Sequence, residues 1–361
     1  MSVCLYQEQT MAKPKVLIIG SGGVGTISAL SLTHNGASDV TLVVRSDYDL
    51  IQEKGFSINS CTYGELKGWR PHHVARSAKE AREEFGPFDY ILLTTKNVPD
   101  GPITCEDIIA PAISNSGKEV IILLQNGIYI EKPMFKRFPG HLILSGVSHI
   151  ASTSYHGHID NKGMDAVFLG DFQKPSIHPD SAEKIQEFIS IYHNHGLNKI
   201  QVDEDVQKTR WEKLMYNSVF NPITAIVDLD VNSLQINNAN DELIRPAMKE
   251  VIAIAKSVGV ECDPSIIKKF VHIGDGLFYS PLMCVDMRKK QLMELEVILG
   301  NPIRVAKENN VAVPILNVIY SLMKMVQFRL KEERKMFTIN HDDFKGNSDD
   351  YPKVFAEKYQ H

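Results

Sequence analysis

A glycine-rich turn near the start of the chain constrains the fold more than any other feature. The apolar segment 16–19 is followed by Gly20-Ser21-Gly22-Gly23-Val24-Gly25 and then by a helix-like stretch, Thr26–Thr33. In such a strand–turn–helix unit, the first glycine permits a tight turn, the second lets a pyrophosphate approach the main chain, and the third lets helix and strand pack closely. A glycine-rich structural turn is the alternative interpretation. The flanking strand and helix favour a dinucleotide site formed by Gly20, Gly22, Gly23, Val24 and Gly25.

Composition and charge narrow the class of protein. The chain has 361 residues, 43% of them hydrophobic and 23% charged, which predicts a globular protein of two domains. The formal net charge of −5 gives no general attraction to polyphosphate, so nucleic acids and anionic membranes are not expected partners. No apolar run approaches the roughly 18 residues that span a bilayer. The five cysteines lack the paired spacing of zinc sites or disulfide frameworks, so we expect a cytoplasmic protein without a bound metal.

The first half of the chain alternates strand-like and helical segments. The strand-like runs are rich in branched apolar residues and comprise Lys15–Gly20, Val40–Val44, Tyr90–Thr95, Val120–Leu124 and Leu142–Val147. Helical segments such as Ser77–Phe85 and Thr104–Ser114 separate them. This alternation predicts an α/β fold with a Rossmann-type, doubly wound parallel sheet. The polar stretch Ser152–Asp171 is interpreted as a hairpin that closes the sheet, and its histidines, His156 and His158, are given no role.

Helical segments dominate the second half. They carry apolar residues at helical spacing and comprise Val206–Ile226, Leu243–Val258, Pro264–Leu277, Leu282–Asn309 and Pro314–Lys335. A helix over Pro179–His195 and a short strand at Lys199–Val202 are expected to complete the first domain. We therefore expect a flexible extension at 1–14, a dinucleotide-binding domain at 15–204, an all-helical domain at 205–335 and a loosely held tail at 336–361.

Polar residues follow several of the predicted strands, at the end of a parallel sheet where ligands bind. Arg45 follows the second strand, where NAD-binding proteins typically carry an acidic residue, and an arginine there suits the 2′-phosphate of NADP. Alternatively, Arg45 is a surface side chain solvated by Asp47 and Asp49. Lys96 and Asn126 follow two further strands. Each is compatible with a functional position, or with an ordinary exposed lysine and an Asn-Gly turn.

A polar stripe marks the apolar helix expected after residue 206. Asn217, Asn221 and Thr224 are spaced i, i+4 and i+7, and Lys213 precedes them by one turn, so the four side chains are expected on one helix face. Buried amides need hydrogen-bond partners. The stripe therefore faces a ligand cleft or forms an internal network between helices, and Pro222 is expected to kink or restart the helix beside it.

Several motifs occur in an order that is typical of one enzyme family. They are the run 20–25, Arg45 followed by Gly55-Phe56-Ser57-Ile58, Thr95-Lys96, Gln125-Asn126-Gly127, the block 213–225 with its Asn-Pro-Ile-Thr-Ala ending, and Asp286-Met287-Arg288 before Glu294. Together they resemble the ketopantoate reductases (2-dehydropantoate 2-reductases). The resemblance spans roughly residues 15 to 330, and the block at 213–225 is its most specific part.

The resemblance implies an NADPH-dependent oxidoreductase acting on CH–OH, with a 2-keto acid as substrate. Reduction of ketopantoate to D-pantoate, a step of pantothenate biosynthesis, is the leading reaction. Lys213 matches the catalytic lysine that protonates the carbonyl oxygen. Glu294 matches the glutamate that hydrogen-bonds the distal hydroxyl of the substrate and helps to place the lysine, so both are predicted catalytic residues. By the same resemblance, substrate is bound by Asn217 and Asn221, and the cofactor by Arg45, Lys96 and Asn126.

One position departs from the family pattern. The serine that usually lies twelve residues before the glutamate is replaced by Leu282, and Ser280 lies two positions away. Either Ser280 binds the substrate carboxylate, or the pocket is more apolar and suits a bulkier 2-keto acid, as in related D-2-hydroxyacid dehydrogenases. A non-catalytic NADPH-binding sensor is a further alternative, which the presence of both Lys213 and Glu294 disfavours. A homodimer is the expected assembly.

Overall fold

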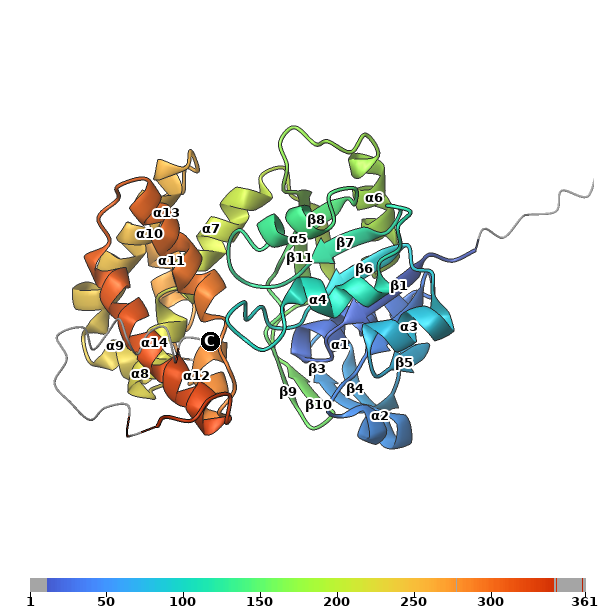
Figure 1. Ribbon diagram of the computed structural model, residues 1–361, viewed down its shortest axis with the longest axis horizontal. Helices are drawn as coiled ribbons and strands as arrows, with labels where there is room; N and C mark the ends of the chain where they lie inside the picture. Colours follow the sequence, from blue (N-terminus) through green and yellow to red (C-terminus); the bar gives the residue numbers. More distant parts are fainter. Residues whose placement is uncertain (1–11, 277, 341, 343–358, 360–361) are drawn as a thin grey trace, which may run out of the picture. The chain divides into compact units, whose positions relative to one another are not determined.

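The computed structural model describes residues 12–276, 278–340, 342 and 359 (Figure 1), and these form two compact units. Unit 1 contains the described residues up to Thr95, together with Ile108–Gln125 and Pro133–Val206. Unit 2 contains Lys96–Asp107, Asn126–Lys132 and the described residues from Gln207 onward. The units are therefore discontinuous in sequence, because two short segments of the first half of the chain belong to unit 2.

Unit 1 is built on a large sheet. Within the described residues it has eight strands, in the order β12 (Lys199–Val202), β11 (Ala166–Asp171), β8 (Ile143–Ser148), β7 (Val120–Leu123), β6 (Tyr90–Leu93), β1 (Lys15–Ile19), β2 (Asp39–Val43) and β5 (His73–Ala75). Neighbours from β8 to β5 are parallel, β11 is antiparallel to β8, and β12 is parallel to β11. The order from β5 to β8 is that of dinucleotide-binding sheets. The predicted α/β fold is confirmed.

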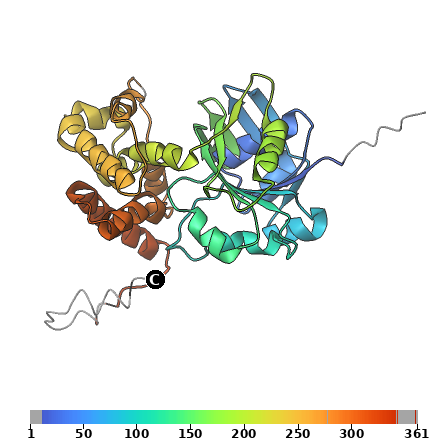
Figure 2. The ribbon, with the colours of Figure 1, turned by 90° about the horizontal axis from the view of Figure 1, so that it is seen from above.

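Helices cover both sides of this sheet (Figure 2). They are α1 (Gly23–His34), α2 (Tyr48–Lys54), α3 (Ala78–Phe85), α4 (Cys105–Ile109, whose first three residues belong to unit 2), the 3-10 turn Ala110–Ala112, α5 (Glu131–Arg137, whose first two residues belong to unit 2) and α6 (Ser181–Tyr192). Because both faces are covered, the central strands β6 and β7 are buried at every position. This explains why their sequences are continuous apolar runs. The start of α3 is set by Ser77, whose side chain accepts a hydrogen bond from the Glu80 N–H.

The interpretation of Ser152–Asp171 as a hairpin closing the main sheet is wrong for its first half. β9 (Ser152–Tyr155) and β10 (His158–Asn161) form a hairpin, but it belongs to a second sheet of four strands with β3 (Phe56–Ser60) and β4 (Gly64–Trp69). The remaining part, β11, does join the main sheet. The sequence analysis did not predict β3, β4 or β5. β4 is polar and has no buried position, β3 is not a continuous apolar run, and β5 has only three residues.

A buried carboxylate joins several elements of unit 1. Asp165 is fully buried and accepts hydrogen bonds from the hydroxyls of Tyr192 (2.9 Å), Tyr63 (3.1 Å) and Ser31, and from the amide of Asn198 (3.4 Å). Burial raises the pKa of Asp165, and these donors oppose the shift. The hydrogen bonds therefore compensate for the removal of the carboxylate from water.

Unit 2 is helical, as predicted. Its elements are α7 (Val206–Asn217, whose first residue belongs to unit 1), α8 (Phe220–Val227), α9 (Val231–Ile236), a π-helical turn (Asn240–Ile244), α10 (Arg245–Ser257), α11 (Ile266–His272), α12 (Leu282–Arg288), a second π-helical turn (Glu296–Gly300), α13 (Asn301–Glu308) and α14 (Pro314–Glu333). Figure 1 shows α10, α13 and α14 running through it. None of its described helices is long and apolar enough to cross a membrane, and the same holds for those described in unit 1.

Several predicted helix boundaries are wrong. The helix expected over Val206–Ile226 is divided between α7 and α8, and the interruption at residues 218–219 precedes Pro222, which cannot donate to the ladder. The helix expected over Leu282–Asn309 ends at Arg288. Lys290 then adopts a left-handed φ of 53°, and the chain is non-helical until residue 295. Most of the expected N-terminal extension and of the expected tail lies outside the described residues.

We predict that Asp165→Ala lowers the free energy of unfolding by about 2–4 kcal/mol, because it leaves several buried donors without their acceptor. Urea unfolding followed by circular dichroism measures this change. Asp180→Ala is the matched control, since Asp180 is exposed before α6 and its side chain makes no capping hydrogen bond. A loss no larger for D165A than for D180A would contradict the role given to the buried carboxylate.

Candidate cofactor-binding and catalytic residues

The glycine turn of unit 1 has a geometry that other residues cannot adopt. Gly20 has a φ of +117°, and a Cβ there would lie 2.8 Å from the Thr94 hydroxyl. A Cβ on Gly25 would lie 1.8 Å from the Gly20 carbonyl oxygen, and one on Gly23 would lie 2.6 Å from the Ser152 carbonyl oxygen. These glycines therefore allow the turn and the helix after it to pack closely.

Gly22 differs from its neighbours, because a Cβ there would meet no protein atom within 4 Å. It immediately precedes α1, a helix of 12 residues whose start has no side-chain cap. Unbonded N–H groups of the first helical turn and the positive end of the helix dipole favour an anion. Open space over Gly22 and an uncapped helix start fit a pyrophosphate, and the cofactor-binding role of this turn stays a prediction.

Arg45 follows β2 and is exposed. In the alternative interpretation, Arg45 is a surface side chain solvated by Asp47 and Asp49, but both carboxylates have other partners. Asp49 pairs with Arg76 (2.7 Å), and Asp47 accepts a hydrogen bond from the Gly157 N–H (3.2 Å). In the part of the chain that the structure describes, neither carboxylate pairs with Arg45, so its guanidinium is not committed to them.

Lys213 lies in α7 of unit 2 and is half-buried. Burial and the neighbouring Arg210 guanidinium lower the pKa of Lys213 to about 8, and Glu294 opposes this shift. An ordinary lysine is almost fully protonated at neutral pH, whereas one with a pKa near 8 can release its proton. The structure thus brings the two predicted catalytic residues, Lys213 and Glu294, close enough to interact electrostatically.

Arg210 is a residue that the sequence analysis missed. It is buried one turn before Lys213, and its Nε lies 2.8 Å from an oxygen of the fully buried Glu131. Its Nη1 also donates to the Gly127 carbonyl oxygen (3.1 Å). Arg210 therefore has two effects on the site. It holds the Asn126-Gly127 turn by a hydrogen bond, and it places a positive charge near Lys213. Its i−3 spacing from Lys213 was the available signal.

Glu294 is buried between two segments that follow strands. Its Oε1 accepts a hydrogen bond from the Asn97 N–H (2.9 Å), and its Oε2 accepts one from the Asn126 amide (3.4 Å). Burial raises the pKa of Glu294, and the Asn97 N–H opposes the shift. Asn97 was given no role from the sequence, and its backbone contact could not be predicted from the residue type.

Lys96, predicted to bind cofactor, makes an ion pair with the buried Asp286 of α12, and its ammonium also donates to the Gln291 side-chain oxygen (3.3 Å). Burial raises the pKa of Asp286, and Lys96 opposes the shift. The motif containing Asp286 thus has a structural explanation in unit 2. The cofactor-binding role of Lys96 stays a prediction.

The predicted polar stripe does not lie on one continuous helix. Asn217 is the last residue of α7, and Asn221 lies in α8; both are buried. The Thr224 hydroxyl donates to carbonyl oxygens of its own helix, those of Phe220 (2.8 Å) and Asn221 (3.0 Å). Thr224 is therefore satisfied locally, while the substrate-binding roles of Asn217 and Asn221 stay predictions.

The structure also shows the surroundings of Ser280 and of Leu282, which replaces the serine of the family pattern. The Ser280 hydroxyl accepts a hydrogen bond from Nη1 of Arg288 (2.8 Å). The Nε of the same arginine lies 2.6 Å from Oδ1 of Asp228. Leu282, the first residue of α12, is 44% exposed. The adjacent Tyr279 pairs its hydroxyl with that of Tyr216 in α7. Ser280 as a substrate ligand stays a prediction, and Leu282 adds apolar surface.

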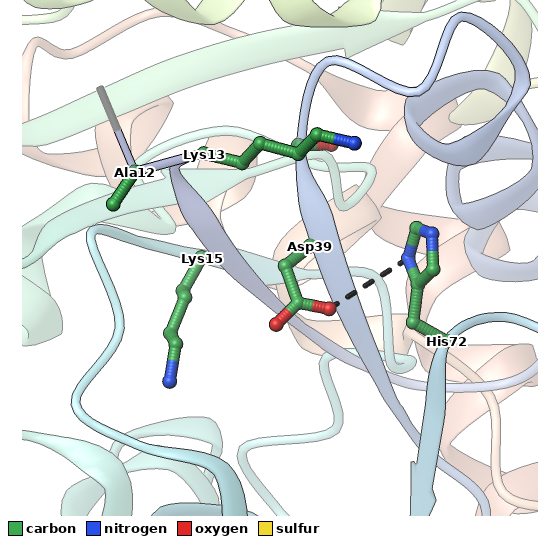
Figure 3. Close-up of a pocket in the computed structure, with 6 residues that line it drawn as sticks. Ala12, Lys13, Lys15, Asp39 and His72 are labelled. Atoms are coloured by element: carbon green, nitrogen blue, oxygen red, sulfur yellow. Dashed lines mark ion pairs between the residues drawn. The ribbon is translucent and has the colours of Figure 1, made fainter. Parts of the chain in front are cut away.

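A cavity of about 350 Å³ lies elsewhere in unit 1 (Figure 3). It is lined by Ala12, Lys13, Lys15, Ser38, Asp39 and His72, and Asp39 forms an ion pair with His72 (3.8 Å). These residues are at the amino ends of β1, β2 and β5, whereas ligands of such sheets bind beyond the carboxyl ends. Within the described ranges, no group of three or more His, Cys, Asp or Glu side chains could hold a metal ion.

Comparisons with known proteins identify the family of this chain. Residues 16–174 match the family described as ketopantoate reductase PanE/ApbA, and residues 205–327 match its C-terminal domain. An uncharacterized protein of Saccharomyces cerevisiae is 43% identical, and the match covers 89% of this chain and 95% of that protein. The chain belongs to the ketopantoate reductase family. Members are oxidoreductases acting on CH–OH groups, and the resemblance stated from the motifs is confirmed.

One further relative and two solved structures are also similar to this chain. A 2-dehydropantoate 2-reductase of Nostoc is 24% identical over 88% of this chain and 97% of its own. The crystal structure of 2-dehydropantoate 2-reductase from Methylococcus capsulatus superposes with a TM-score of 0.72 at 30% identity, covering 88% of this chain and 97% of its own. A D-mandelate dehydrogenase bound to NADH and anilino(oxo)acetate has a TM-score of 0.75 at 21% identity, with 88% and 99% covered, and shows the shared fold.

We predict that Gly22→Ala raises the Kd for a dinucleotide such as NADPH at least about tenfold, which corresponds to about 1.4 kcal/mol. The thermal stability should not fall. The added Cβ meets no protein atom but occupies the space left for the phosphates. Fluorescence titration and thermal unfolding measure the two effects. Gly25→Ala is the contrasting variant, since its Cβ collides with the turn itself and should destabilise unit 1. Wild-type affinity in G22A would exclude this turn as the phosphate site.

Proposed function

We propose that this protein reduces a 2-keto acid to a 2-hydroxy acid, with NADPH as hydride donor and Lys213 as general acid. The observation that carries the proposal is the half-buried ammonium of Lys213, whose pKa is lowered to about 8 by burial and by Arg210. Such a group is mostly protonated at neutral pH and gives up its proton readily. A non-catalytic sensor has no need of this arrangement.

The residues of unit 2 have distinct tasks in this mechanism. When bound, NADPH supplies the hydride that reaches the carbonyl carbon. Lys213 stabilises the negative charge that develops on the carbonyl oxygen and transfers a proton from Nζ to that oxygen. Arg210 increases the acidity of the ammonium, and the Asn97 N–H and Asn126 amide hold Glu294 in place. We assign Asn217, Asn221 and Glu294 to substrate binding.

The residues present also fit the proposed cofactor. The open space over Gly22 and the uncapped start of α1 suit the pyrophosphate. Arg45, which neither Asp47 nor Asp49 neutralises within the described structure, suits the 2′-phosphate and so favours NADPH over NADH. We assign Lys96 and Asn126 to the same cofactor. In the present structure, Lys96 would have to exchange part of its contact with Asp286 for such a role.

Ketopantoate is the first candidate substrate, since several curated relatives are named 2-dehydropantoate 2-reductase. The second candidate is a bulkier 2-keto acid, with the protein acting as a D-2-hydroxyacid dehydrogenase. The exposed Leu282 and the engagement of Ser280 with Arg288 favour it, because both make the expected carboxylate anchor less available. A solved structure of D-mandelate dehydrogenase has the same fold.

Assembly and compartment are part of the proposal. A structural neighbour from Staphylococcus aureus is described as a dimeric ketopantoate reductase, and we propose a homodimer here. The five cysteines are widely scattered along the sequence without paired spacing, which suits a reducing, cytoplasmic environment.

We expect NADPH to be oxidised when ketopantoate is added, and the initial rates across a panel of 2-keto acids identify the substrate. Lys213→Ala should lower kcat by about 10²–10⁴-fold, since the proton donor is lost, while the Kd for NADPH changes little. Lys256→Ala, at an exposed position of α10, is the control. Absence of turnover with every acid, despite NADPH binding, would favour a sensor.

The reduction rate should depend on pH through Lys213. Because the amine must be protonated to donate, kcat/KM for reduction should fall as pH rises through about 8, whereas the rate of the reverse oxidation should rise over the same range. Arg210→Gln removes a positive charge near Lys213, so it should raise the pKa of Lys213 and shift the pH profiles of both directions to higher pH. Steady-state kinetics in both directions measures this. Profiles unchanged by R210Q would contradict the electrostatic role of Arg210.

A further inference from the structure

Two arginines follow neighbouring strands at the same edge of the main sheet. β2 and β5 are parallel, with Val43 opposite Ala75. The N–H of Val44 donates to the Ala75 carbonyl oxygen (2.9 Å), and the residues that follow this hydrogen bond on the two strands are Arg45 and Arg76. The two arginines therefore directly follow adjacent strands, and each precedes a helix, α2 after Arg45 and α3 after Arg76.

The guanidinium of Arg76 is held in a defined orientation. Its Cζ lies 4.0 Å from the centre of the Tyr48 ring, and its Nη2 lies 2.7 Å from Asp49 Oδ1. The side chain is nevertheless 56% exposed, and that of Asp49 is 85% exposed. An ion pair this exposed contributes only about 0–1 kcal/mol to stability. Stability alone is therefore a weak reason for the arrangement, whereas an oriented and accessible guanidinium is suited to binding a ligand.

We propose that Arg76 is a second arginine for the 2′-phosphate of the dinucleotide and determines, with Arg45, the preference for NADPH. The inference rests on the proposed function, since it assigns a residue to the adenosine half of that cofactor. A guanidinium has five N–H donors in a planar fork that matches a phosphate group, and the contact with Asp49 uses Nη2. Phosphate oxygens can therefore bind Arg76 while Tyr48 keeps the guanidinium in place.

Asp49 has an opposing effect in this arrangement. Its carboxylate orients Arg76 in the absence of ligand, but it also places a negative charge beside a position that would receive a phosphate. Like charges repel, and at an exposed position the effect is modest. Asp49 therefore lowers the affinity for the 2′-phosphate, and Asp49→Asn keeps a hydrogen-bonding oxygen while removing the charge.

The test compares two fragments of the cofactor on the full-length protein. 2′,5′-ADP carries the 2′-phosphate and 5′-AMP is the same molecule without it, and isothermal titration calorimetry gives the Kd for each without any turnover. Arg76→Gln should raise the Kd for 2′,5′-ADP about tenfold, which corresponds to about 1.4 kcal/mol, and change the Kd for 5′-AMP less than about twofold. Asp49→Asn should lower the Kd for 2′,5′-ADP only.

Lys79→Gln is the matched control, since Lys79 is a cation on the exposed face of α3, three residues from Arg76, and pairs only with Glu83 among the described carboxylates. It should leave both Kd values unchanged. If R76Q affects both fragments equally or neither, while Arg45→Gln removes the preference for 2′,5′-ADP, the assignment of Arg76 is wrong and the proposed NADPH site stands. If the wild-type protein binds neither fragment, the dinucleotide site and this inference both fail.

Discussion

Buried carboxylates in the helical unit must be compensated, and this requirement determines much of the candidate site. Glu294 is bonded to residues of the segments after β6 and β7, Asp286 to Lys96, and Glu131 to Arg210. A carboxylate removed from water without partners is strongly unfavourable. The segments 96–107 and 126–132 are therefore part of unit 2, although the strands that precede them are part of unit 1.

The same contacts define the electrostatic environment of Lys213. Its ammonium is affected by burial, by the positive charge of Arg210 and by the negative charge of Glu294. Interactions between charges are stronger where water is excluded, so small changes in either neighbour alter the acidity of the lysine. Arg210 in turn is fixed by Glu131 and by the Gly127 carbonyl oxygen. The acidity of the proposed proton donor thus depends in part on Arg210 and Glu131, to which no contact with the substrate is assigned.

The sequence predicted the parts of the molecule that depend on local patterns. β6 and β7 are continuous apolar runs because both of their faces are buried, and Gly20 and Gly25 stand where a Cβ has no room. The second sheet was not predicted, because β4 is polar and its partner strand β3 pairs with β10, which lies far along the chain. The interruption after Arg288 was also missed, since apolar residues continue at helical spacing beyond it. The partners of Lys96 and Arg210 come from distant segments, and no local pattern indicates them.

The discontinuity of the two units limits how the protein can be divided. A polypeptide that began at residue 205 would contain Lys213, Glu294 and Asp286, but it would lack Asn97, Asn126, Glu131 and Lys96. Its buried ionic groups would be left without their counterparts, so the carboxy-terminal half is not a module that could be transplanted alone. A chimaera of two relatives joined near residue 205 would keep these contacts only if the first part supplies the partners that the buried groups of the second part require.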